Sequence, residues 1–109
     1  MTSAAVDILS GMHEDTPFTH RRTDDGVLVL AGSIDDAYAP QLLTLLLDAL
    51  AEAPIVVDLS EVDYLPSVAL SAFVSAWHAD GVHPMTLQAK AGTISQRVLA
   101  VTALPHTAL

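Results

Sequence analysis

Three short apolar runs along the chain have the pattern of β-strands. They occupy residues 27–30, 55–57 and 85–87, and the second consists entirely of β-branched residues. Short apolar runs of this kind are typical of strands that are covered on both faces. We therefore expect three strands, joined by the helical segments that lie between them.

The segment between the first two runs has a helical period. Over residues 38–53, polar side chains recur at steps of three and four residues, and leucines and alanines fill the other side. This spacing predicts a helix with one stripe exposed to solvent. Either Asp35 or Asp36 can cap its start, and Pro40 falls in the first turn, where a missing N–H costs little. The polar stripe consists of Gln41, Thr44, Asp48 and Glu52.

A second helix is predicted over residues 66–79. At about 100° per residue, its larger apolar side chains fall mainly on one side. We expect this side to face the core, and its members are Ala69, Leu70, Phe73, Val74, Ala76 and Trp77. The opposite side carries small or uncharged residues that we expect to be exposed: Ser67, Val68, Ser71, Ala72, Ser75 and His78.

A third helix is predicted to begin at Thr93. Thr93 and Gln96 have the spacing of a capping box, in which a hydroxyl and an amide satisfy each other's backbone donors. Pro105 marks the end of this helix, and Arg97 is expected to reach solvent. The expected apolar stripe consists of Ile94, Val98 and Val101.

An antiparallel hairpin is predicted before the first helix. The extended segments at residues 18–23 and 27–31 flank Asp24, Asp25 and Gly26. Asp-Gly between extended segments favours a hairpin, because a primed turn needs positive φ at both central positions. The alternation of strands and helices that follows implies parallel strands with right-handed crossovers. The fold class is therefore α/β, with one antiparallel pair at the start of a mostly parallel sheet.

Length and composition set the domain organisation. The 109 residues suffice for one domain. Residues 1–17 mix small, acidic and isolated apolar residues without a sustained period, so we expect a flexible N-terminal arm there and one folded domain over residues 18–109. No apolar run approaches the roughly 20 residues of a membrane span. The start of the chain also lacks the basic residues of a signal peptide, so we expect a cytoplasmic protein.

The charge balance narrows the classes of partner. The chain has 4 basic and 13 acidic residues and a net charge of −9, which disfavours nucleic acid and anionic membrane surfaces. It has no cysteine, no phosphate-binding glycine loop and no Gly-x-Ser-x-Gly elbow. Of its histidines, only His78 and His83 are close in sequence, and their spacing does not place two ligands on one helix face. We expect no enzymatic activity, no metal and no cofactor.

The exposed side of the second helix is the strongest candidate for a binding surface. No charged residue occurs between Leu65 and Ala79, although an exposed helix face in an acidic protein normally carries Glu or Lys. Small uncharged side chains are typical of the centre of a protein interface. The alternative is that another element, such as the N-terminal arm, packs over this side.

Several motifs in the chain resemble the STAS domain of bacterial anti-sigma factor antagonists. The family pattern runs G-E-L-D, A-x-x-L and V-V-V-D-L-S-x-V-x-F-I-D-S-S-G-L, and the corresponding residues here are Gly32–Asp35, Ala39–Leu42, Val56–Leu65, Leu70 and Phe73. The resemblance covers about residues 18–104. It implies a STAS fold, with a mixed, mostly parallel sheet of four or five strands, an antiparallel N-terminal hairpin and helices packed mainly on one side. It also implies a partner, an anti-sigma factor with serine kinase activity.

The phosphorylation motif of the family is altered in this chain. In the resemblance, D-S-S-G-L falls on Pro66, Ser67, Val68, Ala69 and Leu70, and the family's kinase phosphorylates the second serine. That position is Val68, which has no hydroxyl. Ser67 is the alternative acceptor, but it is turned by about 100° around the helix axis. The resemblance therefore implies partner binding without the usual phosphoserine switch.

Two functional interpretations remain open. In the first, the protein binds an anti-sigma factor or a related regulator through Ser67, Val68, Ser71 and Ser75. In the second, it is a scaffold subunit that pairs with other STAS or regulator proteins, or with a second copy of itself. Asp35, which matches the aspartate of the G-E-L-D motif, is expected near the same end of the sheet, either to help docking or only to cap the first helix.

Overall fold

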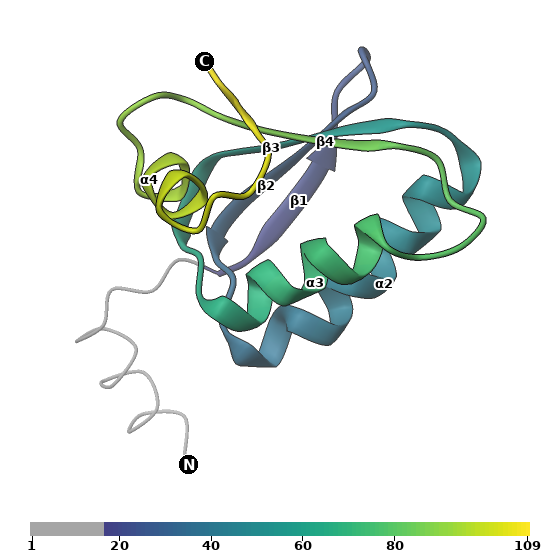
Figure 1. Ribbon diagram of the computed structural model, residues 1–109, viewed down its shortest axis with the longest axis horizontal. Helices are drawn as coiled ribbons and strands as arrows, with labels where there is room; N and C mark the ends of the chain where they lie inside the picture. Colours follow the sequence, from purple (N-terminus) through teal and green to yellow (C-terminus); the bar gives the residue numbers. More distant parts are fainter. Residues whose placement is uncertain (1–16) are drawn as a thin grey trace.

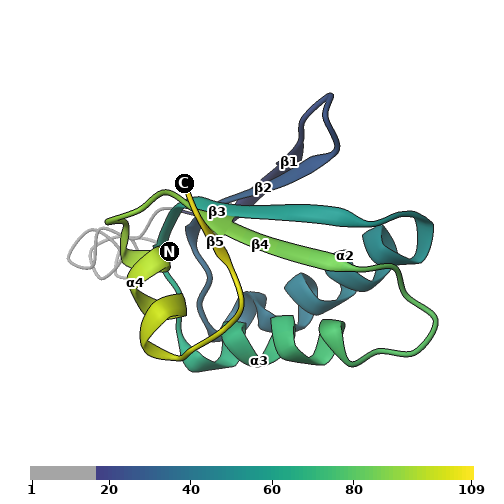
Figure 2. The same ribbon diagram turned by 45° about the horizontal axis from the view of Figure 1, so that its top comes forward.

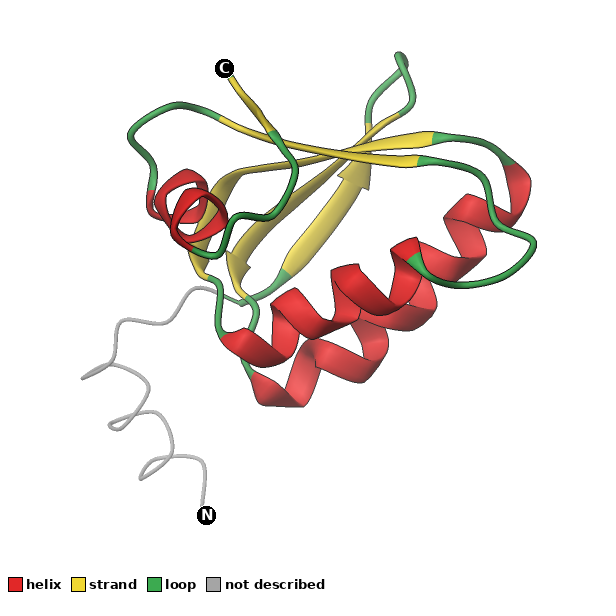
Figure 3. Cartoon of the chain, in the orientation of Figure 1, coloured by secondary structure: helices red, strands yellow, loops and turns green. Residues whose placement is uncertain are grey.

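The computed structural model describes residues 17–109, so the predicted arm at residues 1–17 lies, apart from Pro17, outside the described residues. The chain alternates strands and helices after an initial hairpin (Figures 1 and 3). Its elements are β1 (Thr19–Arg22), β2 (Val27–Ser33), the short 3-10 helix η1 (Asp36–Tyr38), α2 (Ala39–Glu52), β3 (Ile55–Tyr64), α3 (Ser67–Trp77), β4 (Met85–Ala89), α4 (Ile94–Val101) and β5 (Thr107–Ala108).

The five strands form one mixed sheet in the order β1-β2-β3-β4-β5. β1 is antiparallel to β2, and all other neighbouring strands are parallel. The three α-helices lie on the same face of this sheet (Figure 2). The α/β fold class, the mostly parallel sheet and the one-sided helices are therefore confirmed. The expectation that the strands are covered on both faces is wrong for β3 and β4, because Val56 on the other face is only half-buried and its neighbour Thr86 is exposed. It holds for β2, where Val29 on the same face is buried.

The hairpin between β1 and β2 closes through a turn of a different type from the predicted one. The Thr23 N–H donates to the Val27 carbonyl over 2.9 Å, and the Gly26 N–H donates to the Thr23 carbonyl over 3.0 Å. Gly26 has a φ of 82°, whereas neither Asp24 nor Asp25 has a positive φ. A primed turn needs two such residues, so this is a longer loop in which glycine alone occupies the left-handed region. The hairpin is confirmed, and only its turn type differs.

The hydrophobic core lies between the sheet and the helices. Leu42, Leu46 and Leu50 of α2 are fully buried, and the polar stripe predicted for this helix is exposed throughout. On the sheet, Leu28 and Leu30 of β2, Val57 and Leu59 of β3 and Leu87 of β4 face the helices and are fully buried, and Phe73 of α3 and Leu99 of α4 pack against them from the helix side. Burying side chains of this size contributes roughly 1.5–3 kcal/mol each. This core sets the position of α2 and α3 against the sheet.

A polar row crosses the face of the sheet opposite the helices. The strand register aligns Arg21, Val29, Asp58, Gln88 and Thr107 across the five strands. The Gln88 side-chain amide donates to Asp58 Oδ2 over 2.9 Å, and the Ser60 N–H donates to Asp58 Oδ1 over 2.8 Å. Hydrogen bonding of this kind orders β3 and β4 without a covering helix.

The side chain of Asp58 is the one carboxylate of this row. Partial burial by itself raises the pKa of Asp58, but the hydrogen bonds from Ser60 and Gln88 and the positive charge of Arg21 outweigh it, so the pKa lies below its usual value. Arg21 itself forms an exposed ion pair with Glu61, with Nη2 and Oε2 3.0 Å apart. Exposed pairs of this kind contribute little to stability.

The helix α4 presents a different side to the core than the sequence predicts. Ser95 and Leu99 are fully buried, whereas Ile94 is 58% and Val101 86% exposed. The predicted stripe is therefore wrong for Ile94 and Val101, whereas Val98 is half-buried against the core. The inward side is that of Leu99 and of Ser95, whose hydroxyl finds a buried acceptor on β3. Thr93 caps the helix as predicted by accepting from the Gln96 N–H over 3.2 Å. The side-chain oxygen of Gln96, Oε1, accepts from the Gly92 N–H rather than from the Thr93 N–H. Only half of the capping box therefore forms.

No helix within the described part of the chain is long and apolar enough to cross a lipid bilayer.

Candidate functional site

The start of α3 lies at the edge of the sheet where β2 and β3 end. Parallel strands have their carboxyl ends at the same edge, and the Ile34 N–H donates to the Tyr64 carbonyl over 3.1 Å, which joins the two segments that leave the sheet. The helices that follow therefore begin side by side (Figure 1). This geometry brings Asp35, which directly follows Ile34, to the same end of the molecule as Ser67, although the two are far apart in the sequence.

The first turn of α3 is held by its backbone alone. Pro66 is the N-cap residue in extended conformation, with φ −77° and ψ 170°, and no side chain caps the helix. Its carbonyl accepts from the N–H groups of Ala69 and Leu70, over 3.0 and 3.1 Å. Proline suits this position because its fixed φ favours the helix start. The N–H groups of Ser67 and Val68 thus lie at the positive end of the helix dipole with no capping side chain.

The candidate binding residues of α3 form one exposed face. Ser67, Val68, Ser71 and Ser75 are exposed, and we call these four residues the α3 face. Val68 is 37% exposed, so this face presents one hydrocarbon side chain among three hydroxyls. The buried side of the helix carries Ala69, Ala72, Phe73 and Ala76. Ala69, the third residue of the altered motif, is thus a core residue.

The burial of two groups of residues in α3 differs from the sequence prediction. Ala72, which we expected among the exposed residues, is 5% exposed and belongs to the core. Leu70, Val74 and Trp77, which we expected in the core, are only half-buried. The helix is therefore rotated about its axis relative to the prediction, and it packs against α2 as well as against the sheet.

The charges around the α3 face are acidic and lie at its border. Asp35 and Asp36 lie in the segment before α2, and Asp63 lies at the end of β3, next to the start of α3. Asp35 Oδ1 accepts from the Ala37 N–H over 3.0 Å, so this side chain caps η1. The expectation that Asp35 or Asp36 caps α2 is wrong, because the N-cap residue of α2 is Tyr38 and no side chain caps that helix. The α3 face is therefore a neutral surface, and these acidic residues lie in the segments at the end of the molecule where α3 begins.

One residue that the sequence analysis did not single out belongs to this region. Tyr64, the last residue of β3, is 51% exposed and lies four residues before Val68. Tyrosine is enriched at the energetic centres of protein interfaces. In the sequence, Tyr64 comes at the end of an alternating run that indicates a strand. Nothing in that pattern distinguishes a binding residue from an ordinary residue at a strand end.

The histidines and acids of the described region do not form a metal-binding group. Over residues 17–109, no three histidine, aspartate or glutamate side chains lie close enough together to hold a metal ion. His78 and His83 are both exposed and lie in the segment between α3 and β4.

Comparison with known proteins gives a consistent result. A protein-family model described as "Mlab, STAS domain" matches residues 18–104. A solved structure of an anti-sigma factor antagonist from Mycobacterium paratuberculosis is 26% identical in sequence, with a TM-score of 0.61 over 81% of this chain and 78% of that one.

A second solved structure, the anti-sigma factor antagonist SpoIIAA in its unphosphorylated form, has a TM-score of 0.56. It is 14% identical over 81% of this chain and 82% of that one, and at this identity the similarity concerns the fold alone. No curated protein matches the sequence.

Proposed function

Because this chain belongs to the STAS domain family, we propose that it is a non-enzymatic regulatory protein that acts in the cytoplasm by binding another protein through the α3 face. Its partner is an anti-sigma factor or a related regulator. The likeness to the Mycobacterium paratuberculosis antagonist supports this class of partner. The position of the site is inferred from this chain's own residues.

The observation that carries the proposal is the neutral α3 face. Four exposed side chains without charge occupy a helix in a protein with a net charge of −9. An uncharged surface loses little free energy when it gives up its water, whereas a buried unpaired charge is costly. The acidic residues Asp35, Asp36 and Asp63 lie outside this centre, where a polar rim is expected.

The distribution of charge also specifies the chemistry of the partner. A neutral or apolar patch on the partner is expected to meet Val68 and the serines, and basic residues around that patch are expected to face Asp35 and Asp63. Such complementary rim charges mainly raise the association rate, so binding is expected to weaken as the salt concentration rises.

We further propose that the partner does not switch this protein off by phosphorylation at the usual position. In the family pattern the acceptor serine corresponds to Val68, whose side chain is exposed on the α3 face. A hydrocarbon side chain cannot accept a phosphoryl group. Regulation then follows from the amount of the protein or from another signal.

The test is co-purification of tagged protein from its native cells, followed by titration with the partner that is recovered. Ser71→Glu places a charge in the middle of the α3 face and is expected to abolish binding. The matched control is Thr44→Glu, which adds the same charge at an exposed position of α2. This control is expected to bind like the wild type, and circular dichroism should confirm that both variants fold.

The identity of the recovered partner decides between the two interpretations. An anti-sigma factor whose binding is lost in Ser71→Glu supports the proposal. Recovery of a second STAS protein, or of a second copy of this chain, supports the scaffold interpretation instead. Equal binding by Ser71→Glu and the wild type contradicts the assignment of the site to the α3 face.

A further inference from the structure

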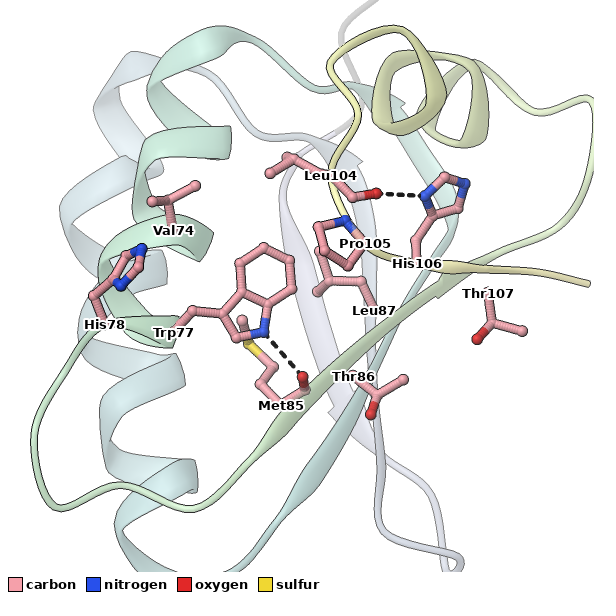
Figure 4. A pocket seen from close by; sticks show the side chains of 10 residues that line it. All are labelled: Val74, Trp77, His78, Met85, Thr86, Leu87, Leu104, Pro105, His106 and Thr107. Atoms are coloured by element: carbon pink, nitrogen blue, oxygen red, sulfur yellow. Dashed lines mark hydrogen bonds between the residues drawn. The ribbon is translucent and has the colours of Figure 1, made fainter.

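A groove runs along α3, between the half-buried side of this helix and the segment that leads from α4 into β5. Its larger part is a cavity of about 650 Å³ beside Trp77 (Figure 4). A second cavity of about 390 Å³ shares Val74 and Leu104 with the first and extends the groove to Leu70, toward the start of α3. Val74 and Trp77, which we expected in the core, therefore line an open groove that follows the helix.

The walls of this groove are largely apolar and carry no negative charge. The Trp77 Nε1–H donates to the Met85 carbonyl over 2.9 Å, so the indole ring is held against β4 (Figure 4). Leu87, Leu104 and Pro105 supply the apolar surface next to it. No residue that lines either cavity is acidic, although the chain has 13 acidic residues. Exposed apolar surfaces of this kind are typical of places where another segment or molecule binds.

The described part of the chain begins beside the start of α3. Because β1 is antiparallel to β2, Thr19 pairs with Ala31 near the end of β2, at the edge of the sheet where α3 begins. Phe18 is buried, and its ring centroid lies 5.3 Å from that of Tyr38, directly before α2. The N-terminal arm, residues 1–17, is therefore tethered at the end of α3 from which the groove leads away.

The sequence of the arm has the length and the composition of an occupant for this groove. Residues 6–12 contain four apolar side chains, those of Val6, Ile8, Leu9 and Met12. The nine residues from Leu9 to Phe18 span up to about 30 Å when extended, whereas the 11 residues of α3 rise by only about 16 Å. The apolar part of the arm can thus reach both ends of the groove.

Charge favours the groove over the other surfaces near the tether. The arm carries Asp7, Glu14 and Asp15 and no Lys or Arg, so the acidic residues in the segments before α2 and α3 repel it. The groove has no acidic residue, and its ionisable side chains are two histidines, His78 and His106. An acidic segment with apolar residues is therefore accepted there without repulsion.

The tether also favours the arm over a free molecule. A segment joined to its site by a short linker has an effective concentration on the order of millimolar, so even a weak contact is formed most of the time. A second copy of this chain has no such advantage, and its charge of −9 repels another copy.

We propose that residues 6–12 of this chain dock in the groove, with Ile8 and Leu9 against Val74 and Trp77. Ser75 lines the groove and also belongs to the α3 face, so the docked arm lies beside the surface proposed for the partner. The proposal does not depend on that partner, because its test uses this chain alone.

Engineered cysteines test the position of the arm, because the chain has no cysteine of its own. Full-length protein with Ile8→Cys and Ser75→Cys carries one thiol in the arm and one at the groove. The matched control combines Ile8→Cys with Thr44→Cys, and both Ser75 and Thr44 are exposed. Under mild oxidation we expect a disulfide within one chain to form at least about tenfold faster in the first pair than in the control. Intact mass without reductant separates disulfides within a chain from those between chains.

The fluorescence of Trp77 gives a second readout, because it is the only tryptophan of the chain. Replacing Ile8 and Leu9 together by aspartate puts charges where an apolar groove cannot accept them. We expect the constant for quenching by acrylamide to rise at least about twofold, because the arm then leaves Trp77 open to solvent. The control, Ser3→Asp with Ser10→Asp, adds the same charge to the arm without removing an apolar side chain and should be quenched like the wild type.

The proposal is wrong if the two cysteine pairs form disulfides within the chain at equal rates. It is also wrong if the aspartates at Ile8 and Leu9 leave the quenching constant at the wild-type value, or if both aspartate variants change it equally. Disulfides that form only between chains would assign the groove to a second copy instead and would overturn the proposal as well.

Discussion

The hydroxyl of Ser95 donates a hydrogen bond of 3.1 Å to the backbone carbonyl of Val62, and both residues are buried. This bond ties α4 to the last part of β3. β4 pairs with β3 only as far as Asp58, so the rest of β3 has no strand on that side, and α4 packs there instead. A polar side chain, together with the apolar side chain of Leu99 on the same side, thus faces the interior, and the bond to Val62 fixes this orientation of the helix.

Replacing Ser95 should show how much this bond contributes. Ser95→Ala removes the donor and leaves the Val62 carbonyl buried without it, so we expect the free energy of unfolding to fall by about 1–3 kcal/mol. Urea denaturation measures this change. Ser75→Ala, at an exposed serine, is the control and should leave stability nearly unchanged. Equal stability of the two variants would contradict the role assigned to the bond.

Ala103 occupies a backbone position that suits glycine. Its φ is 58°, and it follows the end of α4 in a Schellman motif. In this motif the Ala103 N–H donates to the Ala100 carbonyl over 3.1 Å, and the Leu104 N–H donates to the Leu99 carbonyl over 3.0 Å. An L-residue in this region costs about 1 kcal/mol. We therefore expect Ala103→Gly to raise the free energy of unfolding by about 0.5–1 kcal/mol, with a rise of a few degrees in Tm.

A glycine inside the same helix provides the opposite control. Ala100→Gly, at an exposed position of α4, should lower the free energy of unfolding by about 1 kcal/mol. Calorimetry of the two variants should give shifts of Tm in opposite directions. A lower Tm for Ala103→Gly would show that the motif does not strain this residue.

Asp58 should make the protein more sensitive to acid. Its pKa in the folded protein lies below the unfolded value of about 3.9, because hydrogen bonds and Arg21 stabilise the ionised form. The folded state therefore binds a proton less readily than the unfolded state. The resulting stability is present above about pH 4 and is lost as the pH falls through the lower, folded pKa.

Asp58→Asn should remove this dependence while keeping the size of the side chain. We expect lower stability than the wild type at neutral pH and a shallower loss of stability below about pH 4, measured by urea denaturation at a series of pH values. Asp48→Asn, on the exposed stripe of α2, should follow the wild-type curve. If Asp58→Asn keeps the wild-type acid dependence, other carboxylates cause it.

Val68→Ser should create a phosphorylation site where the wild type has none. Incubation with ATP and the kinase-type anti-sigma factor proposed as partner should leave the wild type unmodified, whereas Val68→Ser gains the mass of one phosphate. Intact-mass analysis and peptide mapping distinguish the two proteins. A phosphate mapped to Ser67 of the wild type would contradict the proposed loss of switching.

The local sequence pattern determined which segments form helices and which form strands. The period of polar residues in α2, the apolar runs of β2, β3 and β4 and the threonine cap of α4 each act over a few neighbouring residues, so they are readable along the chain. The absence of charge between Leu65 and Ala79 and the valine at position 68 are likewise properties of the sequence, and they indicated the α3 face before its exposure was known.

The tertiary structure alone decided which sides of the helices are buried and that a fifth strand forms. Ala72 is buried because α2 lies against it, and Ile94 is exposed because Ser95 finds an acceptor on β3, 33 residues away in the sequence. β5 has only two residues and exists through its pairing with β4, so it has no local signal. Such contacts depend on distant partners whose position is set by packing, and no periodicity within a helix contains that information.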